Sequence, residues 1–141
     1  MGGGGSTWDG ITYDPQTNLV YVGVGNGSPW NPLLRSPKGG ENLYSVSIVA
    51  LDADTGELKW HYQEIPEEQW DFDATAQILV ADLEINGELK HVLMHAAKSG
   101  YFYLVDAANG KLLGAKNFVA SNWTNGYDLT TGRPKLNPEA M

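Results

Sequence analysis

The stretch IVALDADTGELKW, Ile48 to Trp60, decides the fold, because a related stretch, YFYLVDAANGKLLG, follows at Tyr101 to Gly114. The two copies align when Asp52 is placed on Asp106, an offset of 54 residues. Each copy has two apolar runs around a turn that contains Asp and Gly, and each follows another apolar run and a turn of small residues. Repeats of about 40 to 50 residues that contain four strands are typical of β-propeller blades. The repeat therefore predicts two four-stranded antiparallel sheets of the same kind.

Short apolar and aromatic runs between turn residues predict strands along most of the chain. Seventeen glycines and seven prolines indicate many turns, and no long segment has an apolar period of 3.6 residues. The turns Thr55-Gly56 and Asn109-Gly110 have the composition of tight hairpin turns, whose central positions need a positive φ. The predicted class is all-β, with strands at residues 10–14, 19–25, 47–53, 57–63, 76–83, 90–97, 101–107 and 111–118.

We interpret residues 1–141 as a partial β-propeller domain. Blade one covers about residues 8–63, blade two covers about residues 72–118, and residues 119–141 are interpreted as the start of a further blade. Closed propellers have about four to eight blades, so two blades cannot close a ring. The chain is therefore expected to be an internal fragment of a larger propeller.

Composition excludes several classes of partner. The net charge of −8 disfavours nucleic acid and anionic membranes, because there is no basic patch to neutralise phosphates, and it favours a cation. The absence of cysteine excludes disulfides and thiolate metal sites within this chain. No apolar run reaches the roughly 18 residues that a membrane span needs, and the start MGGGGS lacks the features of a secretory signal peptide.

The stretch WDFDAT, Trp70 to Thr75, places two carboxylates two residues apart. If this segment is extended, Asp71 and Asp73 point to the same side, where their charges repel unless a cation lies between them. The pair is therefore expected to face either water or a cation.

Several motifs together resemble the quinoprotein alcohol dehydrogenases, eight-bladed propellers that use pyrroloquinoline quinone (PQQ). ALDADTGELKW is similar to the tryptophan-docking motif of that family, in which Trp60 would wedge between blades; the second copy departs from it with Asn109 and Gly114. Further similarity lies in GGGGSTWDGITYDP, VGVGNGSPWNP, EEQWDFDAT and MHAAKSGYFY, in the family's order and spacing. RSPKGGENLYSVSIVALD resembles the alcohol branch of the family rather than the glucose-oxidising branch. The resemblance covers nearly the whole chain.

The resemblance implies three residues for binding PQQ. Trp8 matches the tryptophan on which PQQ stacks, Lys98 matches a basic residue hydrogen-bonded to the quinone, and Ser6 matches a position that contacts PQQ. An indole offers a large flat face to a planar quinone. The alternatives are a Trp8 buried between blades and a Lys98 that is simply solvated at a blade edge.

The resemblance also implies a metal and a catalytic base. Asn26 matches the metal-binding asparagine, and Asp71 matches the catalytic aspartate, which would accept the alcohol proton as hydrogen passes to the quinone. Calcium-dependent members usually have a small residue at the position of Asp73, whereas lanthanide-dependent members have an aspartate that adds a ligand. Asp73 therefore points to a lanthanide ion, with Ca²⁺ as the other candidate. The alternatives are a type I′ turn at Asn26 and a solvated or turn-capping Asp73.

The function that the resemblance implies is oxidation of a primary alcohol to an aldehyde, with a cytochrome c-type electron acceptor and a periplasmic location. Trp30 is a candidate wall of the alcohol pocket, whereas His61, His91 and His95 are interpreted as structural. The family's metal-binding glutamate and its adjacent-cysteine disulfide would lie on blades outside this chain. Two alternatives remain: a cofactor-free propeller that serves as a scaffold of the bacterial envelope, and a fragment without activity of its own.

Overall fold

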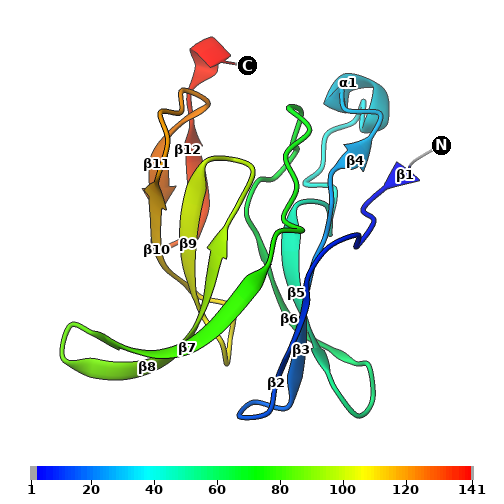
Figure 1. Ribbon diagram of the computed structural model, residues 1–141. Helices are drawn as coiled ribbons and strands as arrows, with labels where there is room; N and C mark the ends of the chain where they lie inside the picture. The colour runs from blue at the N-terminus through cyan, green and yellow to red at the C-terminus, as the bar shows by residue number, and fades with distance from the viewer. Residues whose placement is uncertain (1–2, 141) are drawn as a thin grey trace.

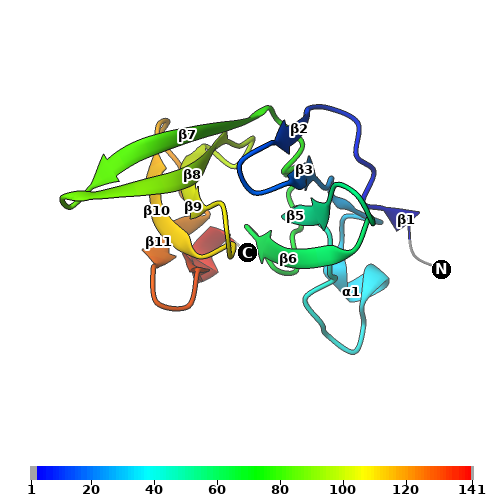
Figure 2. The ribbon, with the colours of Figure 1, turned by 90° about the horizontal axis from the view of Figure 1, so that it is seen from below.

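The computed structural model describes residues 3–140, so both ends of the proposed 1–141 domain lie outside the described residues. Two four-stranded antiparallel sheets lie side by side (Figures 1 and 2). Every strand expected from the sequence is present, although the bounds differ by up to two residues. The first sheet has the order β2-β3-β5-β6, with β2 at Ile11–Asp14, β3 at Leu19–Gly23, β5 at Ser47–Asp52 and β6 at Leu58–Gln63. The second has the order β7-β8-β9-β10, with β7 at Ile78–Ile85, β8 at Glu88–Ala96, β9 at Tyr101–Asp106 and β10 at Leu112–Asn117.

Smaller elements that the sequence patterns did not predict complete the fold. They are the strands β1 (Gly3–Gly4) and β4 (Gly27–Ser28), the helix α1 (Pro32–Arg35), the hairpin strands β11 (Thr124–Asp128) and β12 (Arg133–Leu136), and the 3-10 helix η1 (Pro138–Ala140). The strands β1 and β4 and the helices α1 and η1 are too short for a helical or alternating apolar period to be visible. No helix among residues 3–140 is long and apolar enough to cross a membrane.

The turns that join β5 to β6 and β9 to β10 differ from the predicted type. Only the glycines are left-handed, with φ of 74° at Gly56 and 75° at Gly110. The backbone N–H of Gly56 donates to the carbonyl of Asp52 at 2.8 Å, and that of Gly110 donates to the carbonyl of Asp106 at 2.9 Å. The aspartate carboxylates accept further N–H groups inside the turns. The need for glycine is confirmed, but the tight two-residue turn is wrong, because each aspartate closes a wider loop.

A third turn of this kind escaped the sequence analysis. It joins β11 to β12, where the N–H of Gly132 donates to the carbonyl of Asp128 at 2.8 Å and the Asp128 carboxylate accepts the N–H of Thr130. The flanking segments TNGYD and RPKL are polar, so the apolar runs that revealed the first two copies are missing here.

Trp60 joins the two sheets. Its indole N–H donates to the carbonyl of Ala107 at 3.2 Å, across a separation of 47 residues. A Cβ atom at Gly110 would lie 2.5 Å from the indole ring, so the ring packs directly on the glycine backbone. The first copy of the repeat therefore supplies the tryptophan and the second copy supplies its seat, as the docking motif predicted.

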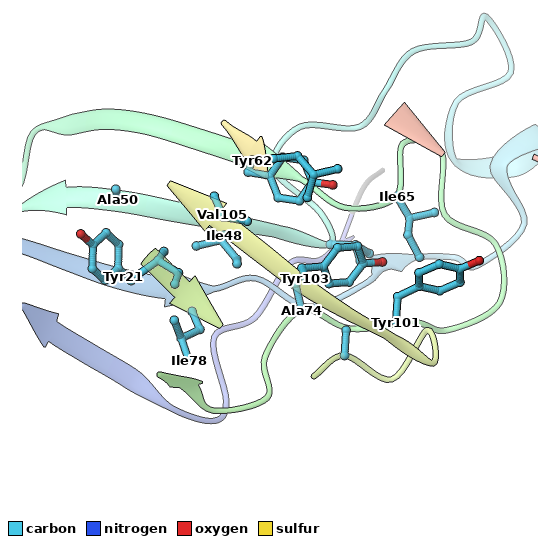
Figure 3. Packing of buried hydrophobic residues seen from close by; sticks show 14 of the residues in the cluster. Tyr21, Ile48, Ala50, Tyr62, Ile65, Ala74, Ile78, Tyr101, Tyr103 and Val105 are labelled. Atoms are coloured by element: carbon cyan, nitrogen blue, oxygen red, sulfur yellow. The ribbon is translucent and has the colours of Figure 1, made fainter. Parts of the chain in front are cut away.

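The core fills the space between the sheets (Figure 3). Tyr21 and Ile48 from the first sheet and Tyr103 and Val105 from the second are fully buried. Tyr62 meets Tyr103 edge to face, with ring centroids 6.1 Å apart. The central strands of both sheets are therefore apolar on the faces that meet.

Two histidines also connect the sheets, in accordance with their structural interpretation. His91 Nε2 lies 2.9 Å from Asp14 Oδ2 of the first sheet, and its Nδ1 lies 2.6 Å from Asp82 Oδ1. His95 Nδ1 lies 2.6 Å from Glu64 Oε1, and both of these side chains are fully buried. Burial alone would lower the pKa of each histidine, but the neighbouring carboxylates outweigh it and raise both pKa values above the ordinary 6.5.

We expect Gly110→Ala to destabilise the chain more than Gly56→Ala. Both substitutions place a side chain at a positive φ, which costs about 1–2 kcal/mol. Only position 110 adds a clash with Trp60, whereas position 56 has open space around it, so the difference should be about 1–3 kcal/mol of unfolding free energy. Urea unfolding of the two variants measures it, and equal losses would contradict the seating of Trp60 on Gly110.

We expect stability to fall as the pH rises above about 6.5. Because the pKa of His91 is raised in the folded state, its contribution is complete below its unfolded value of 6.5 and is lost as pH rises through the folded value. The pKa of Asp14 behaves oppositely: burial would raise it, but hydrogen bonds from Thr17, His91 and Gln16 lower it, so its contribution is lost only as pH falls below 3.8. His91→Gln should reduce the loss of stability above about pH 6.5, with His95 supplying the remainder. Thermal melts across this range test it; an unchanged slope in His91→Gln would contradict the assignment.

Candidate functional site

The candidate site residues lie at one end of the two sheets. They come from the loop 64–77 between β6 and β7, the loop 24–46 between β3 and β5, the turn 97–100 between β8 and β9, and the segment 5–10 before β2. The turns at 14–18, 52–56 and 106–110 lie at the opposite end (Figure 1). The two sheets thus hold four segments that are distant in sequence at the same end of the molecule.

The two carboxylates of WDFDAT face a cation, and that cation is Lys98. Its Nζ lies 3.1 Å from Asp71 Oδ2 and 3.5 Å from Asp73 Oδ2. The hydrogen bond to Asp71 and the charges of both aspartates raise the pKa of Lys98 above its ordinary value. Lys98 is therefore not simply a solvated lysine, although about half of its side chain is exposed.

The backbone is not extended at these aspartates, so the condition on which they would share one side of a strand is not met. Residues 70–77 form no strand, and Asp71 has a left-handed φ of 64°. The carboxylates converge because the loop turns at Asp71 and not because side chains alternate along a strand.

Asp73 is buried and anchors the loop of Asn26. Only 9% of its side chain is exposed, and its Oδ1 accepts the backbone N–H of Asn26 at 2.9 Å. Asp73 is thus not solvated, and it does fix the neighbouring loop. Asn26 does not lie in a type I′ turn, because Gly25, Asn26 and Gly27 all lack a positive φ. The Asn26 amide nitrogen donates to the Gly27 carbonyl, which leaves its carbonyl oxygen as the atom that can face a metal.

Trp8 and Lys98 line one pocket, together with Asp73. The pocket has a volume of about 370 Å³, and Ala96 and Ala97 supply part of its apolar wall. Trp8 is 63% exposed, so it is not buried between the sheets. An open indole face and an ammonium group on one apolar pocket suit a planar anion.

Gly25 is a site residue that sequence reasoning missed. A Cβ atom there would lie 2.9 Å from the carbonyl oxygen of Ser6, 3.0 Å from Asp73 Oδ1 and 3.5 Å from the Trp8 indole nitrogen. Its N–H also donates to the Ser6 carbonyl at 2.9 Å. Ser6 therefore reaches the site through its backbone. The glycine in VGVGNG was a visible signal, but its partners come from segments about 20 and 50 residues away.

Trp30 lies apart from this pocket. It lines a second hollow, of about 720 Å³, with Leu33 and Pro37 of the loop that contains α1. The indole is 57% exposed. The structure thus brings together Trp8, Asp71, Asp73 and Lys98, with Asn26 and Ser6 attached through backbone contacts. Trp30 lines a separate hollow.

The oxygen donors fit a hard cation in kind, since two carboxylates and an amide oxygen are ligands that calcium and lanthanide ions accept. Among residues 3–140, however, no group of three or more His, Cys, Asp or Glu side chains is arranged to hold a metal. Any ion bound here would therefore share its place with the Lys98 ammonium or displace it.

Two adjacent four-stranded antiparallel meanders, joined by a tryptophan docked on an Asp–Gly turn, define neighbouring blades of a β-propeller. Residues 1–116 match the family model described as "PQQ: Glucose/ethanol/alcohol dehydrogenase, beta-propeller domain". The chain belongs to this family of PQQ dehydrogenase propellers.

Similar proteins agree with this membership. The dehydrogenase subunit of a quinone-type alcohol dehydrogenase from Komagataeibacter europaeus is 55% identical over the whole chain. The crystal structure of quinohemoprotein alcohol dehydrogenase from Comamonas testosteroni matches 98% of the chain with a TM-score of 0.94 and 52% identity. A europium-containing methanol dehydrogenase matches 97% with a TM-score of 0.92 and 37% identity. The chain spans 19%, 20% and 23% of these three proteins, respectively.

Proposed function

We propose that this chain forms part of a PQQ-dependent dehydrogenase that oxidises a primary alcohol to an aldehyde. The observation that carries the proposal is the single pocket on which the exposed Trp8 indole, the Lys98 ammonium and the Asp73 carboxylate converge. A propeller that served only as a scaffold would have no need for this combination at one edge. The similarity to proteins named as quinone-type and quinohemoprotein alcohol dehydrogenases supports the same activity.

PQQ, when bound, supplies the two-electron acceptor of the reaction. Trp8 would hold it by stacking, and Lys98 would place a positive charge beside a quinone oxygen where negative charge develops. The backbone near Ser6 would border the same ring. About half of the Lys98 side chain is exposed, so a group bound in the pocket can reach it.

Asp71 would act as the base. Its Oδ2 is hydrogen-bonded to Lys98, so Oδ1 can accept the alcohol's hydroxyl proton while the carbon-bound hydrogen leaves with its electron pair towards the quinone. The Lys98 ammonium also holds this carboxylate in place through the hydrogen bond to Oδ2. Trp30, on the adjoining loop, would form an outer wall for the alcohol.

Asn26, Asp71 and Asp73 would hold the metal ion, which when bound supplies a Lewis acid. The buried Asp73 adds a second negative charge to the site, which favours a trivalent lanthanide over Ca²⁺. The similarity to a europium-containing methanol dehydrogenase supports this preference. We further propose a cytochrome c-type electron acceptor and a periplasmic location for the whole enzyme.

Trp8→Ala should weaken PQQ binding by at least about tenfold, because it removes the stacking face from the pocket. Equilibrium dialysis of PQQ against the chain measures the affinity directly. Tyr13→Ala is a matched control, since Tyr13 is 55% exposed but lies in β2, towards the opposite end of the sheet. Equal affinities of the Trp8 and Tyr13 variants would argue against a quinone in this pocket.

We expect the PQQ-loaded full-length enzyme to oxidise alcohol faster with La³⁺ than with Ca²⁺. Asp73→Ala should abolish this difference in rate, because it removes the additional carboxylate. Steady-state rates with each metal measure this preference. Asp71→Asn should lose about 10²-fold or more with either metal, because the base is gone. A wild-type enzyme that is fully active with Ca²⁺ and gains nothing from La³⁺ would refute the lanthanide assignment.

A further inference from the structure

The Arg35 guanidinium, at the end of α1, connects three segments around the candidate site. Its Nη1 donates to the carbonyls of Pro29 at 2.6 Å and Trp30 at 2.9 Å. Its Nη2 donates to the carbonyl of Glu68 at 2.7 Å, across 33 residues of sequence. Its Nε donates to the side chain of Asn42. The planar fork of arginine can span these acceptors at once, which a single ammonium group cannot do.

Gly27 makes this arrangement possible. A Cβ atom at Gly27 would lie 2.8 Å from Arg35 Nε and 2.9 Å from its Cδ, so the side chain of Arg35 packs directly against the backbone that follows Asn26. Arg35 therefore supports the same loop whose Asn26 backbone N–H is bonded to Asp73.

The Glu68 carboxylate fixes the loop that carries Asp71. Glu68 is fully buried, and its Oε1 accepts the backbone N–H groups of Trp70 and Phe72, the latter at 2.8 Å. These two groups flank Asp71, whose φ of 64° is unfavourable for a residue with a side chain. A conformation of this kind persists only when its surroundings hold it, and the two hydrogen bonds to one oxygen do so.

We propose that Arg35 and Glu68 are positioning residues that together hold Asp71, Asn26 and Trp30 in a fixed relation. The connection is continuous, because Arg35 donates to the Glu68 backbone and the Glu68 side chain accepts from both neighbours of Asp71. This inference rests on the proposed function, in which Asp71 is the base. Neither side chain contacts the pocket of Trp8 and Lys98 directly.

Replacing the second carboxylate oxygen of Glu68 can distinguish a positioning role from a role in acid–base chemistry. Oε2 is buried without a hydrogen-bond partner among residues 3–140. A glutamine would keep the accepting oxygen and place its amide nitrogen where Oε2 lies. Glu68→Gln should therefore preserve a positioning role and would abolish a role that needs the carboxylate charge.

The test compares Glu68→Ala with Glu68→Gln in the PQQ-loaded full-length enzyme. Glu68→Ala should lower kcat by about tenfold or more, with PQQ content unchanged, because Asp71 loses its fixed backbone. Glu68→Gln should stay within about threefold of the wild type, the size of effect expected when the hydrogen bonds are kept. Glu57→Ala is the control, since the Glu57 carboxylate is exposed and pairs with Lys59, far from the loop of Asp71. Arg35→Lys should raise the KM for the alcohol, because the carbonyl of Trp30 loses its donor. This variant tests the positioning role if Glu68→Ala fails to fold.

Amide hydrogen exchange in the chain itself gives a readout that does not depend on activity. Glu68→Ala should accelerate exchange at Trp70 and Phe72, whereas Glu68→Gln should not. A wild-type enzyme without PQQ-dependent oxidation would refute the proposed function, and exchange at these two amides would still decide whether Glu68 holds the loop. Unchanged kcat in Glu68→Ala, or an equal loss in Glu68→Gln, would overturn the positioning role.

Discussion

The contact of Trp60 with the turn at Gly110 is the interaction on which the rest of the structure depends. A four-stranded antiparallel sheet with one apolar face is not stable alone, and here each sheet buries that face against the other. The indole fixes how the sheets meet, because its ring needs the bare glycine backbone and its N–H needs the Ala107 carbonyl. Once this contact is made, the loops at the opposite end of the sheets have fixed relative positions.

The electrostatics of the site follow from that placement. Asp71 and Asp73 lie in the loop that leaves β6 of the first sheet, and Lys98 lies in the turn between β8 and β9 of the second sheet. Their convergence therefore depends on how the two sheets dock. In an acidic chain two adjacent carboxylates are costly unless a cation accompanies them. Here that cation is the Lys98 ammonium group. The same charges that hold Lys98 would also attract a metal ion, which explains why one small region can serve both a quinone and a metal in the proposed function.

The loops of the site are held by buried polar groups and not by regular structure. Glu68 is fully buried, and burial raises its pKa despite the backbone N–H groups that it accepts. Arg35 satisfies carbonyls from two different segments. Such groups can impose a strained backbone at Asp71 with a precision that an apolar contact would not provide, because hydrogen bonds are directional.

The sequence alone determined the class of fold, the eight main strands and the docking tryptophan, because these depend on local alternation and on a repeat that can be read along the chain. It also singled out Trp8, Asp71, Asp73 and Lys98, which prove to be neighbours. Only the tertiary structure decided that the backbone turns at Asp71, that Lys98 lies between the two aspartates, and that Arg35 and Glu68 brace their loop. These features depend on contacts between residues 27 and 33 positions apart, such as Asp71 with Lys98 and Arg35 with Glu68, and no local pattern encodes such pairs.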